Sequence, residues 1–352
     1  MEQRVKELLK SVFHPETGED IVSSNIVDNI SVEESKIRVT LIFKKSRDPF
    51  AIKIKGEVQE ILSSNFQSMQ VTVYIREGES KRVPNDKPRT LTSAVAHSIA
   101  ISSGKGGVGK STVTANLAIT LRDMGFRVGV LDADIYGPSQ HKMFGCEGFM
   151  PEAERDEELG IDAILPAETM GIKLMSIGFF IRANDALMWR GTMASNALKQ
   201  LIHQTKWGVL DFLLIDMPPG TGDIHLQLIN ELKLSGAVIV STPQQVAVAD
   251  VIRGVEMFRH PQVDVPISGI VENMSWFTPE ELPDARYYLF GREGAKNYAI
   301  NNNIPFLGEV PIIQSVMEGS ELGQPAVIGD NRVKEYYLQI CEKIVQNTLK
   351  KC

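Results

Sequence analysis

Two patterns of apolar and polar positions divide the chain into a short and a long part. In the first part, apolar residues recur at helical spacing over residues 5–12 and 50–62. Short runs rich in β-branched residues at 37–43 and 71–75 predict strands. Residues 1–78 are therefore predicted to form a small α/β module.

A polar stretch follows this module. Residues 76–89 carry two prolines and show no apolar periodicity. Such a composition is typical of a linker between folded parts. We therefore place a linker at 79–92 and expect a second, larger domain at 93–352.

In the larger domain, apolar runs alternate with amphipathic segments. The runs are apolar almost throughout, as in parallel strands that are covered on both faces. They lie at 97–102, 127–131, 211–215, 236–241, 267–271 and 305–308, and helices fit between them at 110–124, 223–233, 246–259 and 331–350. This alternation predicts a doubly wound, mostly parallel α/β sheet that binds its ligand at the carboxyl ends of the strands.

Composition narrows the class of protein. An apolar fraction of 43% is enough for a buried core, and a net charge of −7 argues against a nucleic-acid partner or an anionic membrane. The sequence has no 18-residue apolar run and no apolar stretch after a basic start, so we expect neither a membrane span nor a signal peptide. Three scattered cysteines do not make a disulfide framework, which favours a cytoplasmic protein.

A complete phosphate-binding motif follows the first strand of the larger domain. It reads Gly104, Lys105, Gly106, Gly107, Val108, Gly109, Lys110, Ser111 and Thr112, and it matches G-x-x-x-x-G-K-[ST]. In such a loop the backbone amides surround the phosphates of ATP, the lysine reaches the β- and γ-phosphates, and the serine ligates Mg²⁺. A flexible glycine turn is the alternative, and the strand–loop–helix setting disfavours it.

Carboxylates follow two other predicted strands. Asp132 and Asp134 end the run at 127–131, and Asp216 ends the run at 211–215. Because the carboxyl ends of parallel strands share one edge, these side chains should lie beside the phosphate loop. Asp216 then has the Walker B arrangement for Mg²⁺, and residues 217–223 form a plausible second switch. Each aspartate taken alone could instead cap a helix or a turn.

The second lysine of the loop, Lys105, makes the motif resemble the deviant Walker A family that includes MinD, ParA and the nitrogenase iron protein. The resemblance implies a homodimer in which Lys105 reaches the nucleotide of the partner, whereas a solvated loop lysine is the alternative. It also implies that the segment with Asp132 and Asp134 is the first switch, in which Asp134 positions the attacking water and Asp132 holds a magnesium-bound water. Asn273 would read the adenine edge, with Pro311 near the base.

Five segments narrow the resemblance further. They read SSGKGGVGKSTVTANLA, VLDADIYGPSQ, LLIDMPPGTGD, STPQQVAVAD and VENMSWF, and together they resemble the Mrp/ApbC iron–sulfur cluster carrier ATPases. The stretch 188–202 looks like the element that these proteins carry between their switches, and the N-terminal module is similar to the assembly domain fused to many of them. The resemblance implies an ATP-hydrolysing homodimer that delivers clusters to apo iron–sulfur proteins or assembly factors.

The sequence departs from that family at the cluster ligands. Members with cluster sites carry C-P-x-C shortly after the asparagine strand, but residues 276–291 contain no cysteine here. Cys146, Cys341 and Cys352 show no ligand spacing. An iron–sulfur cluster is thus implied by the resemblance alone, and its ligands are unknown.

Two other functions compete with the carrier. A MinD-like regulatory or positioning switch would use the apolar stripe of the last predicted helix, formed by Val333, Tyr337, Ile340, Cys341, Ile344, Val345 and Leu349. Packing of that stripe on the sheet is the simpler explanation. A small-molecule kinase or amidoligase of related fold is the third reading, but no sequence feature indicates an acceptor pocket.

Overall fold

The computed structural model describes residues 2–15, 17–33, 36–43, 48, 50–77, 91–92, 94–157, 159–180, 192–279, 281–282 and 284–349. The chain divides into two compact units, one made of residues 1–88 with 123–126 and one made of residues 89–122 with 127–352. Most of the expected linker at 79–92 lies outside the described residues, so its boundaries remain a prediction.

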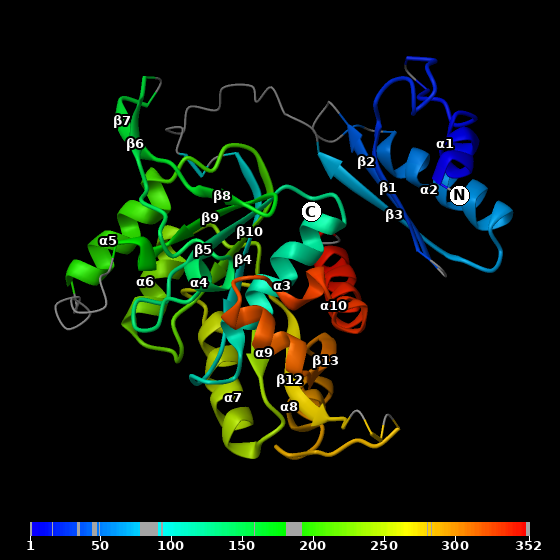
Figure 1. The fold of residues 1–352 in the computed structure, drawn as a ribbon. Coiled ribbons are helices and arrows are strands. Elements are labelled where there is room, and N and C mark those ends of the chain that lie inside the picture. The colour runs from blue at the N-terminus through cyan, green and yellow to red at the C-terminus, as the bar shows by residue number, and fades with distance from the viewer. Residues whose placement is uncertain are drawn as a thin grey trace. The chain divides into compact units, whose positions relative to one another are not determined.

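The smaller unit is a three-stranded sheet with two helices (Figure 1). Its elements are α1 (Glu2–Leu9), β1 (Val27–Glu33), β2 (Lys36–Phe43), α2 (Ala51–Asn65) and β3 (Gln70–Glu77). The central strand β2 pairs antiparallel with β1 and parallel with β3. Alternate residues of β2, among them Val39 and Leu41, are fully buried in one core with Leu9 of α1 and Val58 of α2. The apolar side chains follow the period-2 geometry of a strand, and the intervening Arg38 and Thr40 are buried too.

The larger unit contains the remaining elements of the described chain. They are β4 (Val95–Ser102), α3 (Lys110–Asp123), β5 (Val128–Asp132), α4 (Gln140–Met143), β6 (Ala153–Asp156), β7 (Ile161–Ile164), β8 (Ala167–Thr169), β9 (Ile172–Ser176), η1 (Ile177–Phe179), α5 (Thr192–Gln204), β10 (Leu210–Asp216), α6 (Asp223–Glu231), β11 (Gly236–Ser241), α7 (Gln245–Arg259), β12 (Ile267–Phe277), α8 (Gly294–Asn301), β13 (Phe306–Ile312), α9 (Gln314–Glu321), η2 (Ala326–Ile328) and α10 (Asn331–Leu349).

The main sheet has the strand order β13-β12-β11-β4-β10-β5-β9-β8. All neighbours in it run parallel except β8, which is antiparallel to β9. The chain passes from β4 across β10 to β5, and later returns to β11 on the other side of β4. This reversal places a topological switch point at the carboxyl end of β4, where sheets of this type bind ligands. The predicted doubly wound α/β fold is confirmed.

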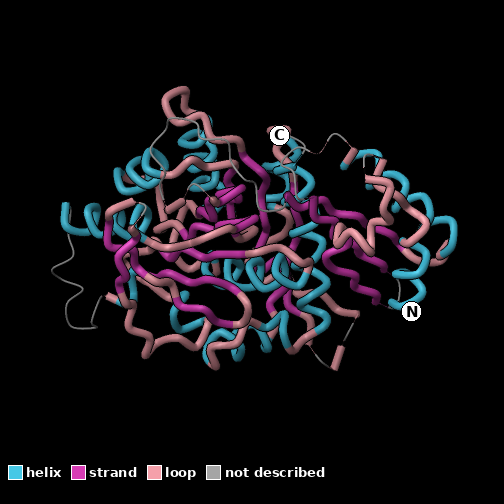
Figure 2. The backbone as a smooth tube through the Cα atoms, turned by 90° about the horizontal axis from the view of Figure 1, so that it is seen from above, coloured by secondary structure: helices cyan, strands magenta, loops and turns pink. Residues whose placement is uncertain are grey.

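Helices cover both faces of this sheet, as Figures 1 and 2 show. Buried residues of α5, α6, α7 and α8 share one core with β4, β10 and β11. On the other face α10 packs against β12 and β13 and lies beside α3, where the Cys341 thiol is 3.7 Å from the Leu117 carbonyl oxygen.

The apolar stripe of α10 is therefore part of the core. Val333, Tyr337, Ile340, Cys341, Ile344 and Val345 are all buried. The predicted packing on the sheet is confirmed, and it removes the feature on which a membrane-binding switch depended. Among the described residues, no helix is both long enough and apolar enough to cross a membrane.

Several elements have no counterpart in the sequence prediction. Strands β1 and β6 to β9 are short or alternate with polar residues, and β6 has no buried residue. Helix α9 likewise has no buried residue. Such elements show little apolar periodicity in the sequence, so they are recognised only when the segments that they pair or pack with are known.

The helix α8 begins without a capping side chain of its own and is capped from a distant strand. Glu272 of β12 is fully buried, and its carboxylate accepts hydrogen bonds from the backbone N–H groups of Ala295 (2.7 Å) and Lys296 (3.2 Å). An acidic group at this position satisfies two N–H groups that a first helical turn leaves open. Burial raises the pKa of Glu272, although these hydrogen bonds oppose the shift.

We expect Glu272→Ala to lower the free energy of unfolding by about 1–3 kcal/mol, because it leaves these N–H groups buried without an acceptor. Glu272→Gln keeps an acceptor oxygen and should have a smaller effect. Thermal and guanidinium unfolding followed by circular dichroism measures both. Glu256→Ala on the exposed side of α7 is the matched control. Equal stability of Glu272→Ala and this control would contradict the capping role.

Candidate functional site

The loop between β4 and α3 has a shape that only glycine permits at several positions. Gly107 and Gly109 have φ of 80° and 79°, in the left-handed region. A Cβ on Gly109 would lie 2.3 Å from Nδ2 of Asn273, and one on Gly104 would lie 2.4 Å from the backbone carbon of Asp250. The glycines therefore allow the loop to pack closely on its neighbours while its amides stay free for a ligand.

This loop borders an open pocket of about 260 Å³ at the carboxyl ends of the strands. The pocket is lined by Gly106 to Thr112 of the loop and by Ser103, Asp134, Gly137, Ser139, Met143 and Pro219. Residues from both predicted switch segments thus face the phosphate loop. The loop residues Gly104 and Lys105 are not part of this lining.

The side chain of Lys110 lies inside a cluster of acids and is only 6% exposed. Its Nζ forms an ion pair with Asp216, lies 3.6 Å from Asp134 Oδ2, and lies 3.4 Å from the hydroxyl of Ser111. Burial alone would lower the pKa of Lys110, but the neighbouring carboxylates outweigh it and raise that pKa. Lys110 is therefore a protonated cation that is already paired before any phosphate arrives.

The acids outnumber this cation. Asp132 and Asp216 are fully buried and Asp134 is 7% exposed. Burial and the nearby Asp216 raise the pKa of Asp132 to about 7. Burial raises the pKa of Asp134 too, against the attraction of Lys110. Three carboxylates around one ammonium leave an excess of negative charge, which a divalent cation would relieve.

The donors present suit Mg²⁺. Carboxylate and hydroxyl oxygens are the ligands that this hard cation prefers, and it usually keeps several waters and takes the rest from nucleotide phosphates. Ser111 and Asp216 would hold the ion, directly or through water, with Asp132 behind them. In the described part of the chain, no group of three or more His, Cys, Asp or Glu side chains could hold a metal ion.

Asp132 is held in place by the segment that follows it. Its Oδ2 accepts hydrogen bonds from the backbone N–H groups of Ser139 (3.1 Å) and Gln140 (3.0 Å) and from the hydroxyl of Ser176 (2.8 Å). Gln140 also donates from its side chain to Asp216. Sequence reasoning assigned no role to Gln140, although it ends the segment VLDADIYGPSQ, and it missed Ser176, which belongs to none of the quoted segments.

The other expected site residues lie around the loop. Lys105 Nζ donates to Gln244 Oε1 at 3.2 Å. Asn273 Nδ2 donates to the Val108 carbonyl at 2.9 Å, and Pro311 is buried on the neighbouring strand. The structure thus brings Asn273 against the loop itself. Its role toward adenine, like that of Pro311, stays a prediction.

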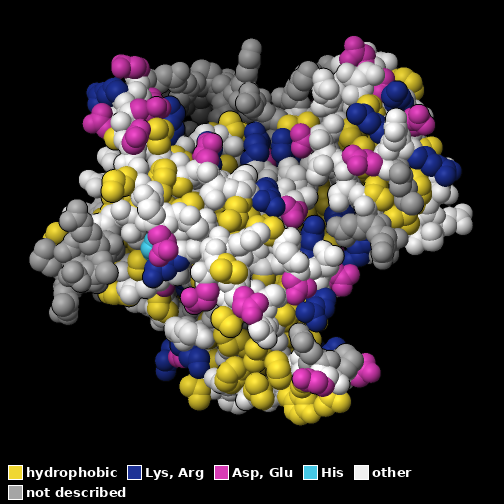
Figure 3. Space-filling view, in the orientation of Figure 1, with side chains coloured by type: hydrophobic (Ala, Val, Ile, Leu, Met, Phe, Trp, Pro, Cys, Tyr) yellow, Lys and Arg dark blue, Asp and Glu magenta, His cyan; other side chains and the backbone are white. Residues whose placement is uncertain are grey.

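The two described cysteines, Cys146 and Cys341, lie in different segments of the larger unit. Cys341 is fully buried, and burial raises its pKa well above the usual value. Cys146 is half-buried in the segment after α4, and Cys352 lies outside the described residues. The segment after β12, where the C-P-x-C motif is missing, folds back so that Phe277 and Tyr287 exchange backbone hydrogen bonds. Apolar side chains of this segment, including Leu282, are exposed, and Figure 3 shows apolar surface gathered at that end.

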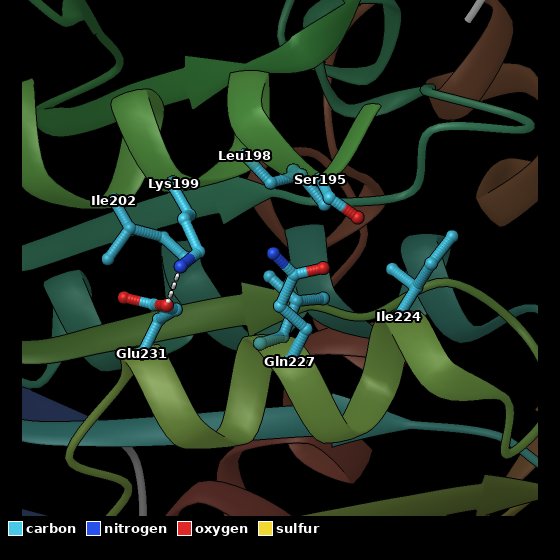
Figure 4. A pocket seen from close by; sticks show the side chains of 8 residues that line it. Ser195, Leu198, Lys199, Ile202, Ile224, Gln227 and Glu231 are labelled. Carbon is cyan, nitrogen blue, oxygen red and sulfur yellow. Dashed lines mark ion pairs between the residues drawn. The ribbon is translucent and has the colours of Figure 1, made fainter. Parts of the chain in front are cut away.

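A second depression lies between α5 and α6 (Figure 4). Leu198 and Ile202 face Ile224 and Leu228 there, and Lys199 pairs with Glu231 at its edge. These side chains fill the space, so it is a packing seam between two helices. The first residues of the predicted stretch 188–202, up to residue 191, lie outside the described residues.

We expect Lys110→Ala to destabilise the nucleotide-free protein by about 3–5 kcal/mol, because it leaves Asp216 buried without its cation. Adding Asp216→Asn should recover most of that loss. The measurement is guanidinium unfolding of the single and double variants without nucleotide. Lys199→Ala breaks a partly exposed ion pair and should change stability by less than about 1 kcal/mol. If the double variant lost as much stability as the two single variants together, the result would contradict coupling between Lys110 and Asp216.

Comparisons with known proteins agree with this geometry. The NUBPL iron-transfer P-loop NTPase family matches residues 94–346, and a family described as iron-sulfur cluster assembly protein matches residues 2–73. The iron-sulfur cluster carrier protein of Synechocystis is 38% identical and covers 91% of this chain and 90% of its own length. The iron-sulfur cluster transfer protein NUBPL of Dictyostelium discoideum is 38% identical over 88% of this chain and 93% of its own length.

Solved structures show the same fold. A nucleotide-binding protein from Archaeoglobus fulgidus, in complex with ADP, is 38% identical, has a TM-score of 0.58, and covers 68% of this chain and 91% of its own. The cell division ATPase MinD of Pyrococcus furiosus is 22% identical with a TM-score of 0.52 over 71% of this chain and 99% of its own, which bears on the fold alone. This chain belongs to the NUBPL iron-transfer family of P-loop NTPases, as its resemblance to the iron–sulfur cluster carriers predicted.

Proposed function

We propose that this protein binds ATP with Mg²⁺, hydrolyses it as a homodimer, and carries iron–sulfur clusters to apo iron–sulfur proteins or assembly factors in the cytoplasm. The observation that carries the proposal is the cluster of Lys110 with Asp132, Asp134 and Asp216 beside a complete phosphate loop. The names of the relatives and the matching N-terminal module support the cargo.

In this proposal, nucleotide binding exchanges the partners of Lys110. Its ammonium now pairs with Asp216, and it must leave that carboxylate to reach the β- and γ-phosphates. Ser111 and Asp216 would then hold Mg²⁺, which would neutralise charge on the phosphates. Asp134, on the wall of the pocket, positions the water that attacks the γ-phosphate.

Lys105 acts on the nucleotide of the partner subunit. It lies outside the lining of its own pocket, and its ammonium contacts Gln244 rather than the acids around Lys110. A cation that enters a neighbouring site can stabilise the charge that develops during phosphoryl transfer. A role of Lys105 in the neighbouring site requires a homodimer.

An iron–sulfur cluster requires thiolate ligands, and the C-P-x-C motif that usually supplies them is absent from this chain. Iron–sulfur clusters are held by cysteine thiolates, and a buried thiol with a raised pKa is a poor ligand. Cys341 is such a thiol, enclosed between α10 and α3. It therefore has no part in our proposal for cluster binding.

The first test is anaerobic reconstitution with iron and sulfide, followed by metal analysis per dimer and transfer to an apo-ferredoxin. We expect bound iron and sulfide, transfer that responds to ATP, and unchanged iron content in Cys341→Ala. Lys110→Ala should lose the response to ATP while it keeps the cluster. A protein that hydrolyses ATP but takes up no iron and transfers none would contradict the carrier function.

Mixing two inactive variants tests the role of Lys105. In a heterodimer of Lys105→Ala and Lys110→Ala, one site keeps its own Lys110 and receives Lys105 from the other subunit. An equimolar mixture should therefore recover about a quarter of wild-type ATP hydrolysis, since half of the dimers carry one complete site. Activity that stays at the level of either variant alone would place Lys105 in its own subunit.

A further inference from the structure

Gln140, the first residue of α4 and the last of the segment VLDADIYGPSQ, is fully buried beside the phosphate loop and the strand-end aspartates. Its side-chain Nε2 donates to Asp216 Oδ2 at 2.7 Å and to the carbonyl oxygen of Ser111 at 2.9 Å. Both neighbours are acceptors, so the amide nitrogen must face them and the amide oxygen must point away.

The backbone of the same residue holds a second carboxylate. The N–H group of Gln140 donates to Asp132 Oδ2 at 3.0 Å. Gln140 therefore contacts the beginning of α3 at Ser111, the end of β10 at Asp216 and the end of β5 at Asp132. Its side chain and its backbone N–H group therefore link three parts of the site: the phosphate loop, the Walker B carboxylate of Asp216 and the first switch segment at Asp132.

The amide oxygen of Gln140 is a buried acceptor without a donor. Oε1 has no hydrogen-bond partner, although the side chain is completely enclosed. A buried polar atom without a partner is unfavourable and calls for an explanation. A metal-bound water is a strong donor, and Mg²⁺ usually keeps several of its waters in nucleotide sites.

We propose that Gln140 is a positioning residue of the magnesium site. Its amide nitrogen orients Asp216, and its amide oxygen accepts a hydrogen bond from a magnesium-bound water. Through its backbone hydrogen bond to Asp132, Gln140 couples the presence of the metal ion to the conformation of the first switch. The inference rests on the proposed binding of ATP with Mg²⁺. It goes beyond that function by naming a residue that links the metal to the switch. Groups that orient the ligands of a metal typically change its affinity about 10- to 100-fold when they are removed.

The orienting contact matters most when nucleotide is bound. Asp216 Oδ1 faces Lys110 and lies 3.4 Å from the hydroxyl of Thr114, while Oδ2 faces Gln140. When Lys110 turns to the phosphates, the Gln140 amide is the stronger of the contacts that remain on Asp216. The carboxylate then keeps its orientation for Mg²⁺.

The test measures nucleotide affinity with and without the metal. The probe is fluorescent mant-ADP, titrated into the full-length protein in excess Mg²⁺ and again in EDTA. The variants are Gln140→Leu and the length-matched Gln140→Met, and Gln200→Leu on the exposed side of α5 is the control. We expect both Gln140 variants to bind mant-ADP about tenfold more weakly in Mg²⁺ and within about twofold of wild type in EDTA.

Hydrogen exchange of residues 133–143 provides the second readout. Mg²⁺ with ADP should slow exchange there in wild type and in Gln200→Leu, but not in the Gln140 variants. Equal weakening with and without Mg²⁺ would indicate a merely structural role and overturn the inference, as would unchanged affinity in both conditions. Failure of wild type to bind mant-ADP at all would overturn the proposed function itself, and this inference with it.

Discussion

The pairing of the buried Lys110 ammonium with Asp216 and Asp134, with a third buried carboxylate, Asp132, nearby, governs the rest of this site. Unpaired charges are costly in a protein interior, and removing one member of such a cluster leaves the others exposed to that cost. Lys110 therefore cannot leave Asp216 unless another cation replaces it. In the proposed function a nucleotide with Mg²⁺ would supply both halves of this exchange, since its phosphates would attract Lys110 while Ser111 and Asp216 would hold the metal. This explains why the metal and the nucleotide should bind together.

The fold creates this cluster through strand order. Asp132 and Asp216 are direct register partners on the adjacent strands β5 and β10, so their side chains leave the sheet at the same level. The neighbouring strand β4 delivers the phosphate loop to the same edge. The loop packs tightly on its neighbours at Gly104 and Gly109, where an added Cβ would meet Asp250 and the side chain of Asn273. The glycines are thus required by the packing of the loop as well as by its conformation.

This chain contains the nucleotide-binding residues of the family but lacks its usual cluster ligands. The loop, both aspartate-bearing strands and the N-terminal module follow the family throughout, whereas the C-P-x-C motif after β12 is absent. That segment is instead closed by backbone pairing of Phe277 with Tyr287 and by Arg286 stacked 4.3 Å from the ring of Trp276. Membership of the family therefore identifies the nucleotide-binding residues of this chain, but it does not identify side chains that would bind a cluster.

The sequence by itself determined the phosphate loop, the aspartates at the strand ends and the parallel character of the sheet. Each of these depends on residues close together in the chain, so a local pattern is enough to reveal it. Tertiary structure alone decided that Asn273 holds the loop at Val108 and that Gln140 reaches Asp216 from 76 positions away. The positions of strands β1 and β6 to β9, which are short or alternate with polar residues, also became clear only from the tertiary structure. Periodicity records which face of a segment is buried, but a hydrogen-bond partner distant in sequence is set only when the segments pack together.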